Sequence, residues 1–197
     1  MIRFRIPLLA AALSALFALA SPAAMAAELP GDSVYRVNAQ LTDSHGNALT
    51  FADAAGHVRL ATLFYASCGY VCPMLIEQIR RIEGKLDDTE RARLRVLLVT
   101  VDPERDTPEA LAALAQKRKL DTTRWTLVQP ANADLRKLAA VLDVQYRELD
   151  DGEFNHSSII TLLDPQGRVL ARSSNLGGEP DPEFVAMLRK ALAAAQQ

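Results

Sequence analysis

The feature that most constrains the fold of this chain is a buried-strand pattern, followed by a pair of cysteines and then by a helical pattern. Residues 58–65 form a nearly continuous apolar run, which is typical of a buried central strand. Cys68 and Cys72 follow, with three residues between them, and Pro73 suits the first position of a helix. Backbone N–H groups gather at such a junction and stabilise a thiolate. The two cysteines, which are the only ones in the sequence, therefore predict a soft-metal site, a redox couple, or both.

Strand and helix patterns alternate along the rest of the chain, after an extended, loosely structured lead-in at 27–40. They predict an α/β fold in which a mixed central sheet is flanked by helices, with an N-terminal β-hairpin and right-handed βαβ crossovers. Neither an internal repeat nor an interdomain linker is found in the sequence, so one domain is expected over 27–197. The expected elements are a hairpin at 39–51, strands at 58–65, 95–101 and 125–128, helices at 73–86, 108–119, 132–142 and 181–194, an extended segment at 144–146, a turn at 150–152, and a second hairpin made by 158–163 and 168–172.

The first 26 residues have the pattern of a secretory signal peptide. Arg3 and Arg5 precede an uncharged apolar run at 8–20, and Ala24 and Ala26 form a small-residue cleavage site. The apolar run is short for a transmembrane helix, which needs about 20 residues. Cleavage after Ala26 is therefore favoured over an uncleaved inner-membrane anchor, and we expect a periplasmic protein in a compartment that permits disulfides.

The charge balance argues against nucleic acid as a partner. The chain has 22 basic and 24 acidic side chains, and the expected signal peptide carries two of the basic ones and no acid. No basic block remains in the rest of the chain. A bridge between Cys68 and Cys72 would close a very small loop and would stabilise the fold little, so the pair is interpreted as functional rather than structural.

Three motifs carry a resemblance to a known family. They are Cys68-Gly-Tyr-Val-Cys72-Pro73, Val101-Asp-Pro-Glu-Arg-Asp-Thr-Pro-Glu109, and Asn155-His156-Ser157 ahead of the expected strand at 158–163. In this order they resemble the SCO/SenC family of thioredoxin-fold proteins, which handle copper for the assembly of respiratory cytochrome oxidase. The resemblance covers about residues 35–193 and implies a thioredoxin-like fold with Cys68, Cys72 and His156 as metal ligands.

The implied function is that of an exported copper metallochaperone. It would bind one copper ion, as Cu(I) or Cu(II), and deliver it to a copper-receiving oxidase subunit or another copper-site protein. Soft sulfur ligands select copper, zinc or iron–sulfur species, and three ligands suit trigonal Cu(I) better than structural zinc, which usually takes four. A Cys68–Cys72 disulfide could not bind metal, so loading depends on a thiol reductant. A monomer is expected.

The histidine distinguishes this chain from thioredoxins, which place a proline opposite their cysteines. His156 stands there instead, and this favours metal capture over general disulfide exchange. The ring needs a hydrogen-bond acceptor to fix its tautomer, and Asn155 is a weak candidate for that role. The family usually has Asp where this chain has Asn155, and Pro and Asp where it has Gly69 and Tyr70. Two carboxylates near the expected site are therefore missing.

Two other functions are open to a dithiol protein of this kind. The first is a thiol–disulfide oxidoreductase that reduces the cysteines of a partner's copper site, with Cys68 attacking and Cys72 resolving. Its weakness is the three-residue spacer, which differs from the Cys-x-x-Cys of dedicated oxidoreductases. The second is a peroxidase of the peroxiredoxin type. This reading is set aside because Tyr65 and Gly69 stand where its Thr or Ser, three residues before the cysteine, is required.

The remaining candidate residues are assigned structural roles. His45 and His57 are interpreted as solvated turn residues, Trp125 as sheet core, and Met74 as core on a helix face, with a thioether that could approach a metal. A loop and helix-cap network, or alternatively a docking surface for a partner, is expected from Asp102, Arg105, Asp106 and Glu109.

Overall fold

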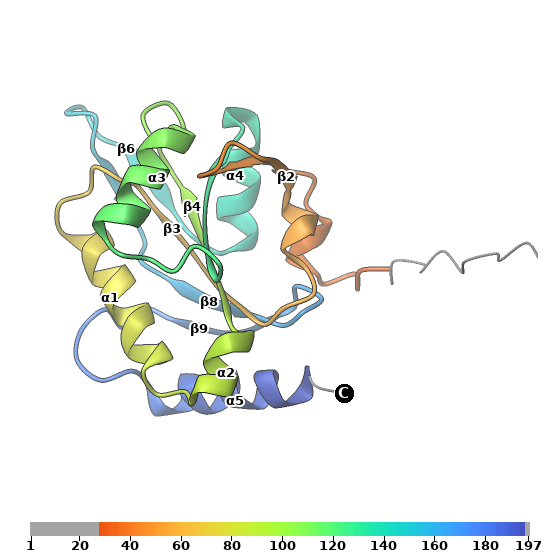
Figure 1. The fold of residues 1–197 in the computed structure, drawn as a ribbon. Coiled ribbons are helices and arrows are strands. Elements are labelled where there is room, and N and C mark those ends of the chain that lie inside the picture. The colour runs from red at the N-terminus through yellow and green to blue at the C-terminus, as the bar shows by residue number, and fades with distance from the viewer. Residues whose placement is uncertain (1–27, 196–197) are drawn as a thin grey trace, which may run out of the picture.

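The computed structural model describes residues 28–195, and the expected signal peptide lies outside them. Within the described residues the main sheet has seven strands in the order β2-β1-β5-β4-β3-β8-β9, and helices pack around it (Figure 1). The mixed sheet, the flanking helices and the N-terminal hairpin are as the sequence predicts. The strands are β1 (Gln40–Asp43), β2 (Ala48–Thr50), β3 (Arg59–Phe64), β4 (Arg95–Thr100), β5 (Trp125–Pro130), β8 (Ile160–Leu163) and β9 (Val169–Ser173).

Two parallel pairings form the centre of this sheet. β3 pairs in parallel with β4 and β4 with β5, whereas β8 runs antiparallel to β3. All six residues of β3 are buried, which explains its continuous apolar pattern. In the parallel register Phe64 lies opposite Thr100, so the loops that follow β3 and β4 meet at one edge of the sheet. This edge of an open α/β sheet is where ligand sites usually form.

The helices agree with the sequence patterns except at their ends and in one omission. α1 begins two residues before Pro73, which is therefore its third residue rather than its first. α2 has no counterpart in the expected elements, although Asp87 and Glu90 form a capping box at its N-terminus. The helices are α1 (Val71–Glu83), α2 (Asp88–Arg93), α3 (Pro108–Lys117), α4 (Asn132–Val141) and α5 (Pro182–Ala194).

The lead-in is ordered rather than loose over its described part. A short 3-10 helix, η1 (Val34–Arg36), buries Tyr35 against Phe51 in an edge-to-face contact with ring centroids 5.3 Å apart. Gly167 makes this possible, because a Cβ there would lie 2.4 Å from the Tyr35 ring. The expectation of a loose lead-in was wrong because it neglected this long-range contact, which a local pattern does not reveal. A second 3-10 helix, η2 (Phe51–Ala54), follows β2.

A second, smaller sheet stands apart from the main one. β6 (Tyr146–Glu148) and β7 (Phe154–His156) pair antiparallel in a hairpin around the expected turn near Gly152. In the described residues this sheet has two strands and pairs with no strand of the seven-stranded sheet. No helix of residues 28–195 is both long enough and apolar enough to cross a membrane.

Candidate functional site

The two cysteines lie at the junction between β3 and α1. Cys72 is the second residue of α1 and is 3% exposed, whereas Cys68 sits in the preceding loop and is half-buried. The backbone N–H of Cys72 donates to Sγ of Cys68 over 3.3 Å, and the backbone N–H of Tyr65 donates to Sγ of Cys72 over 3.5 Å. The first turn of a helix leaves its N–H groups without internal partners. Cys68 therefore accepts a hydrogen bond that the helix would otherwise leave unmade.

The two sulfurs differ in their affinity for a proton. A hydrogen bond from the Cys72 side chain, helped by backbone N–H groups of Cys72 and Tyr70, lowers the pKa of Cys68 to about 4, although partial burial opposes this. The hydrogen bond to Cys68 and burial both raise the pKa of Cys72. The free pair is thus one accessible thiolate and one buried thiol at neutral pH. This combination suits a nucleophile and a resolving partner, or two metal ligands once Cys72 loses its proton.

The structure brings His156 to the cysteines from the far end of the chain. Its Nε2 lies 3.8 Å from Sγ of Cys72. Its Nδ1 lies 3.2 Å from the carbonyl oxygen of Ser157, which can only accept, so Nδ1 carries the proton and Nε2 presents its lone pair to the sulfur. Burial lowers the pKa of His156, which favours the neutral ring. The acceptor that fixes the tautomer is therefore a backbone carbonyl, and Asn155 is exposed.

The separation between Cys72 and His156 fits a shared metal ion. Bonds of about 2.3 Å to sulfur and about 2.0–2.1 Å to nitrogen, opening at about 110–120°, place the two donors about 3.6–3.8 Å apart. No group of three or more His, Cys, Asp or Glu side chains among residues 28–195 could hold a metal ion as the side chains stand. A third bond, from Cys68, therefore requires these side chains to rearrange. The Cys72 sulfur and the His156 nitrogen are thus donors of the kind that suits a soft ion, and a further sulfur, that of Cys68, lies four positions before Cys72.

The loop after β4 supports the cysteine loop. The sequence motifs alone do not reveal this contact. Asp106 is 2% exposed and accepts hydrogen bonds from the backbone N–H of Ala66, over 2.8 Å, and from the hydroxyl of Thr100. Burial raises the pKa of this carboxyl. The expected cap network is present, with Thr107 as the N-cap of α3 and Asp102 paired with Arg105. Docking of a partner on this loop remains a prediction.

The sequence analysis did not single out Tyr65 as a neighbour of the cysteines and the histidine. Its hydroxyl donates to Oε2 of Glu153 over 2.9 Å, and its ring meets the His156 ring at a centroid distance of 5.9 Å. The available signal was its place three residues before Cys68, directly after the strand β3. Its role depends on a partner 88 positions away, which no local pattern indicates.

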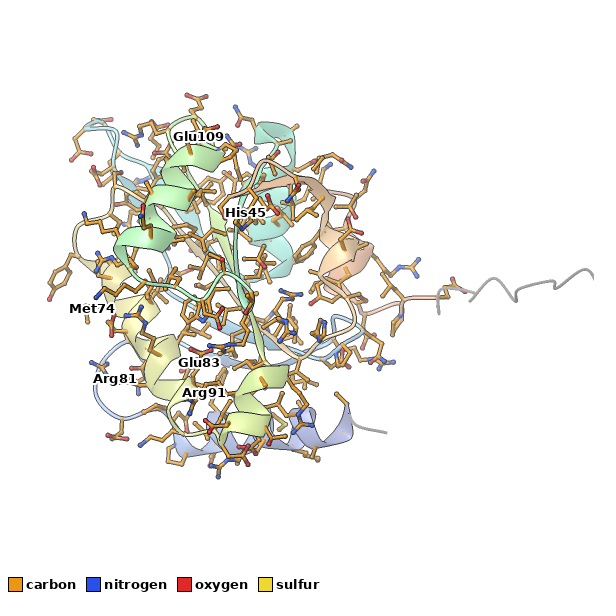
Figure 2. The ribbon with its side chains drawn as sticks, in the orientation of Figure 1. His45, Met74, Arg81, Glu83, Arg91 and Glu109 are labelled. Carbon is orange, nitrogen blue, oxygen red and sulfur yellow. The ribbon has the colours of Figure 1, made fainter. Side chains whose placement is uncertain are left out.

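The other candidates lie outside the cysteine–histidine cluster. His45 and His57 are exposed, as expected of turn residues, and Trp125 is 2% exposed in the sheet. Met74 is half-buried on α1 rather than part of the core, because this early turn of the helix lies next to the open cysteine loop. Figure 2 shows Met74 on α1 and His45 in the N-terminal hairpin, well separated in the molecule.

A mixed sheet with a dithiol at the β3–α1 junction and an imidazole facing it defines a thioredoxin-like dithiol protein with metal-binding potential. The SCO1/SenC family model matches residues 30–193. The chain therefore belongs to the SCO1/SenC family.

Known proteins of this kind resemble the chain over most of its length. The SCO1 protein homolog of Bacillus subtilis is 24% identical over 149 residues, covering 74% of this chain and 77% of that protein. A putative copper-binding protein of Stutzerimonas stutzeri is 25% identical over 129 residues, covering 65% of this chain and 63% of that protein, so the chain spans less than two thirds of that relative.

Solved structures agree with this assignment. Bradyrhizobium japonicum ScoI, solved with copper bound, has a TM-score of 0.62 at 27% identity and covers 78% of this chain and 97% of its own. BsSco, described as a member of the Sco family of cytochrome c oxidase assembly proteins, has a TM-score of 0.67 at 20% identity, over 84% of this chain and 98% of its own. At that identity the second likeness shows the fold alone. The predicted thioredoxin-like fold is confirmed.

Proposed function

We propose that this protein is an exported copper metallochaperone. It binds one copper ion through Cys68, Cys72 and His156 and delivers it during the assembly of a respiratory cytochrome oxidase. The observation that carries this proposal is the 3.8 Å approach of the His156 Nε2 to the Cys72 sulfur. The copper-bound ScoI neighbour supports the choice of cargo, and membership of the SCO1/SenC family supports the role in oxidase assembly. The Arg3–Ala26 pattern supports export to the periplasm.

Cys68, Cys72 and His156 have different roles in the binding and release of copper. Cys68, already a thiolate, supplies the first sulfur to an incoming ion, and Cys72 follows by giving up its proton. His156 closes the set with a neutral nitrogen whose tautomer Ser157 fixes. Release to a copper-receiving oxidase subunit exchanges these ligands one at a time, and the half-exposed Cys68 is the donor that a partner's thiolate can approach first. A thiol reductant keeps Cys68 and Cys72 in the reduced form.

A second function is favoured by the contrast between the two cysteines. As a thiol–disulfide oxidoreductase, Cys68 would attack a disulfide in a partner's copper site, forming a mixed disulfide and releasing one partner thiolate. Cys72, after losing its proton, would attack the Cys68 sulfur and release the second thiolate. Two electrons pass to the partner, and Cys68 and Cys72 end as a disulfide that an external thiol must reduce. The lowered pKa of Cys68 and the burial of Cys72 support this reading.

A copper titration of the reduced chain separates the two functions. The wild type, His156→Ala, Cys72→Ser and the control His45→Ala would each be titrated with Cu(I), against a colorimetric chelator, and with Cu(II). His45 is an exposed histidine outside the cluster, so its variant tests whether the loss of an unrelated imidazole lowers the copper affinity. The chaperone requires one copper per chain, a clear loss of affinity in His156→Ala, a larger loss in Cys72→Ser, and none in the control. Weak binding that ignores His156, with rapid turnover of a disulfide substrate, would instead establish the oxidoreductase.

A further inference from the structure

The hairpin that carries His156 has little support from the main sheet. β6 and β7 pair with each other, over Tyr146–His156 and Glu148–Phe154, and with no strand of the seven-stranded sheet in the described residues. A residue in a central strand is fixed by hydrogen bonds on both sides, whereas a two-stranded hairpin is marginal by itself. The position of His156 must therefore depend on side-chain contacts between the hairpin and the body of the protein.

The packing beneath the hairpin is incomplete. A hollow of about 580 Å³ lies between the hairpin and α4, lined among others by Ala139, Val144, Tyr146 and Phe154. Another hollow, of about 350 Å³, lies on the hairpin itself and is lined by residues 145–147 and 155–157. The hollow along α4 leaves that side of the hairpin without continuous contacts to the body of the protein. Specific attachments elsewhere must supply the restraint.

Tyr65 supplies the first attachment, on the side of the cysteines. Its hydroxyl donates to Oε2 of Glu153 over 2.9 Å and lies 3.3 Å from the carbonyl oxygen of Phe154. Its ring packs against Phe154 at 5.6 Å and against His156 at 5.9 Å between centroids. The backbone N–H of the same residue donates to the Cys72 sulfur. One buried residue thus contacts the hairpin and the dithiol together.

Arg105 supplies the second attachment, from the loop after β4. Its guanidinium donates to the carbonyl oxygen of Gly152 at the hairpin turn and lies 5.8 Å from the centroid of the Phe154 ring. The buried carboxylate of Asp102 pairs with this guanidinium and orients it. Gly152 has a φ of +78°, and a Cβ there would lie 3.2 Å from the arginine, so a glycine allows the close approach. Arg105 is part of the second sequence motif, and the metal-ligand role leaves it unexplained.

We propose that Tyr65 and Arg105 form a clamp that holds the β6–β7 hairpin and thereby sets the position of His156 against the cysteines. Both are positioning residues: neither is a metal ligand, and each acts through the hairpin. The inference rests on the proposed role of His156 in copper binding. Residues that orient metal ligands typically contribute 10–100-fold to metal affinity. We expect loss of either contact to weaken Cu(I) binding by roughly 10-fold. The loss acts through the histidine for Arg105 and mainly through it for Tyr65, whose hydroxyl also interacts with the Cys68 side chain.

The test compares single and double variants of the full chain. Tyr65→Phe removes only the hydroxyl, and Arg105→Lys keeps the charge but loses the planar fork that reaches Gly152 and Phe154. Tyr35→Phe and Arg168→Lys are matched controls. Tyr35 is a buried tyrosine of η1, and the Arg168 side chain is 46% exposed and ion-paired, against 48% for Arg105. Cu(I) affinity is measured by chelator competition, and hydrogen exchange of the hairpin amides is followed in the copper-free protein.

The clamp predicts two experimental results that a general structural role does not. Tyr65→Phe and Arg105→Lys should speed exchange at the hairpin amides of Leu149 and Gly152, which are bonded within the turn, while β3 stays protected. Each should weaken Cu(I) binding in the wild-type background. When His156 is already alanine, Arg105→Lys should have no effect and Tyr65→Phe should lose most of its effect. The controls should change neither quantity.

Each alternative outcome has a distinct meaning. An equal loss of affinity with and without His156 would overturn the clamp, because Tyr65 would then act on the thiols directly. Unchanged affinity in Tyr65→Phe and Arg105→Lys, with a loss in His156→Ala, would overturn the clamp and leave the proposed function intact. If His156→Ala itself had no effect, the three-ligand site and the clamp that serves it would both be wrong.

Discussion

The cysteines and the histidine are held by regions that are built differently. Cys68 and Cys72 follow a strand whose six residues are all buried and which pairs on both sides, and they enter a helix of 13 residues. His156 lies in a three-residue strand of a separate hairpin with hollows beside it. The first region is part of the core, and the second is attached to it by a few side chains.

This difference separates two tasks within one site. The core fixes the backbone around the sulfurs, and their hydrogen bonds give Cys68 its thiolate character before any ion arrives. The hairpin provides the third donor from an element that can move without unfolding the domain. In the proposed copper site the Cys68 side chain would also have to rearrange, so the cysteine backbone is the fixed part of the site and the hairpin is the adjustable part.

The largest expected effect tests the rigid side of the comparison. Leu63, in the middle of β3, is 0% exposed, so Leu63→Ala leaves a cavity in the central sheet. We expect a loss of about 2–5 kcal/mol in the free energy of unfolding, measured by urea denaturation. Surface substitutions usually change the free energy of unfolding by no more than about 0.5 kcal/mol. A loss as small as that would show that the cysteine junction does not depend on the core.

A substitution in the hairpin should have a smaller global effect. Phe154→Ala removes a half-buried ring that contacts Tyr65 and Arg105. Because the ring borders a hollow, we expect a loss of only about 1–2 kcal/mol, less than the 3–5 kcal/mol typical of a fully buried Phe. Hydrogen exchange should report a locally opened hairpin and an intact main sheet. Uniform acceleration in both sheets would mean that the two regions unfold together.

Cysteine alkylation should show that the junction is organised without metal. With a pKa of about 4, Cys68 is a thiolate at neutral pH, so its reaction with iodoacetamide should vary little between about pH 6 and 8. The rate should fall by half near pH 4, whereas an unfolded thiol, with a pKa of about 8.5, should slow steeply below pH 8. Cys72, buried and with a raised pKa, should react last.

The same lowered pKa has a consequence for stability. Because folded Cys68 binds its proton more weakly than the unfolded chain does, its contribution to stability is present above the unfolded pKa and is lost as the pH falls toward about 4. Mass spectrometry of the alkylated peptides assigns each rate to its cysteine. A Cys68 rate that rises tenfold per pH unit through neutrality would contradict the hydrogen-bonded thiolate.

The smallest effect is expected at the tip of the cysteine loop. Tyr70 is 76% exposed, so Tyr70→Ala should change the free energy of unfolding by less than about 0.5 kcal/mol. Its backbone N–H, which helps to lower the pKa of Cys68, is retained in the variant. Thermal unfolding and Cu(I) affinity should both match the wild type. A marked loss of affinity would assign the exposed ring a role in holding the ion.

The order of the elements and the cysteine junction could be predicted from the sequence because both are local. The apolar run at 58–65, the helical spacing after Pro73 and the cap at Thr107 report on neighbours a few positions away. η1 escaped prediction because it is stabilised by burial of Tyr35 beside a distant turn. β7 was not among the expected elements because its three residues are too few to show a period.

The chain by itself determined which donors exist and how two of them are spaced, since the interval between Cys68 and Cys72 and the helix that follows are properties of contiguous residues. Tertiary structure decided that the imidazole of His156 meets the Cys72 sulfur, and that Tyr65 and Arg105 hold the hairpin that brings it there. Those contacts join residues 47 to 88 positions apart. Only the closing of the sheet and the packing of its loops at one edge can bring such residues together.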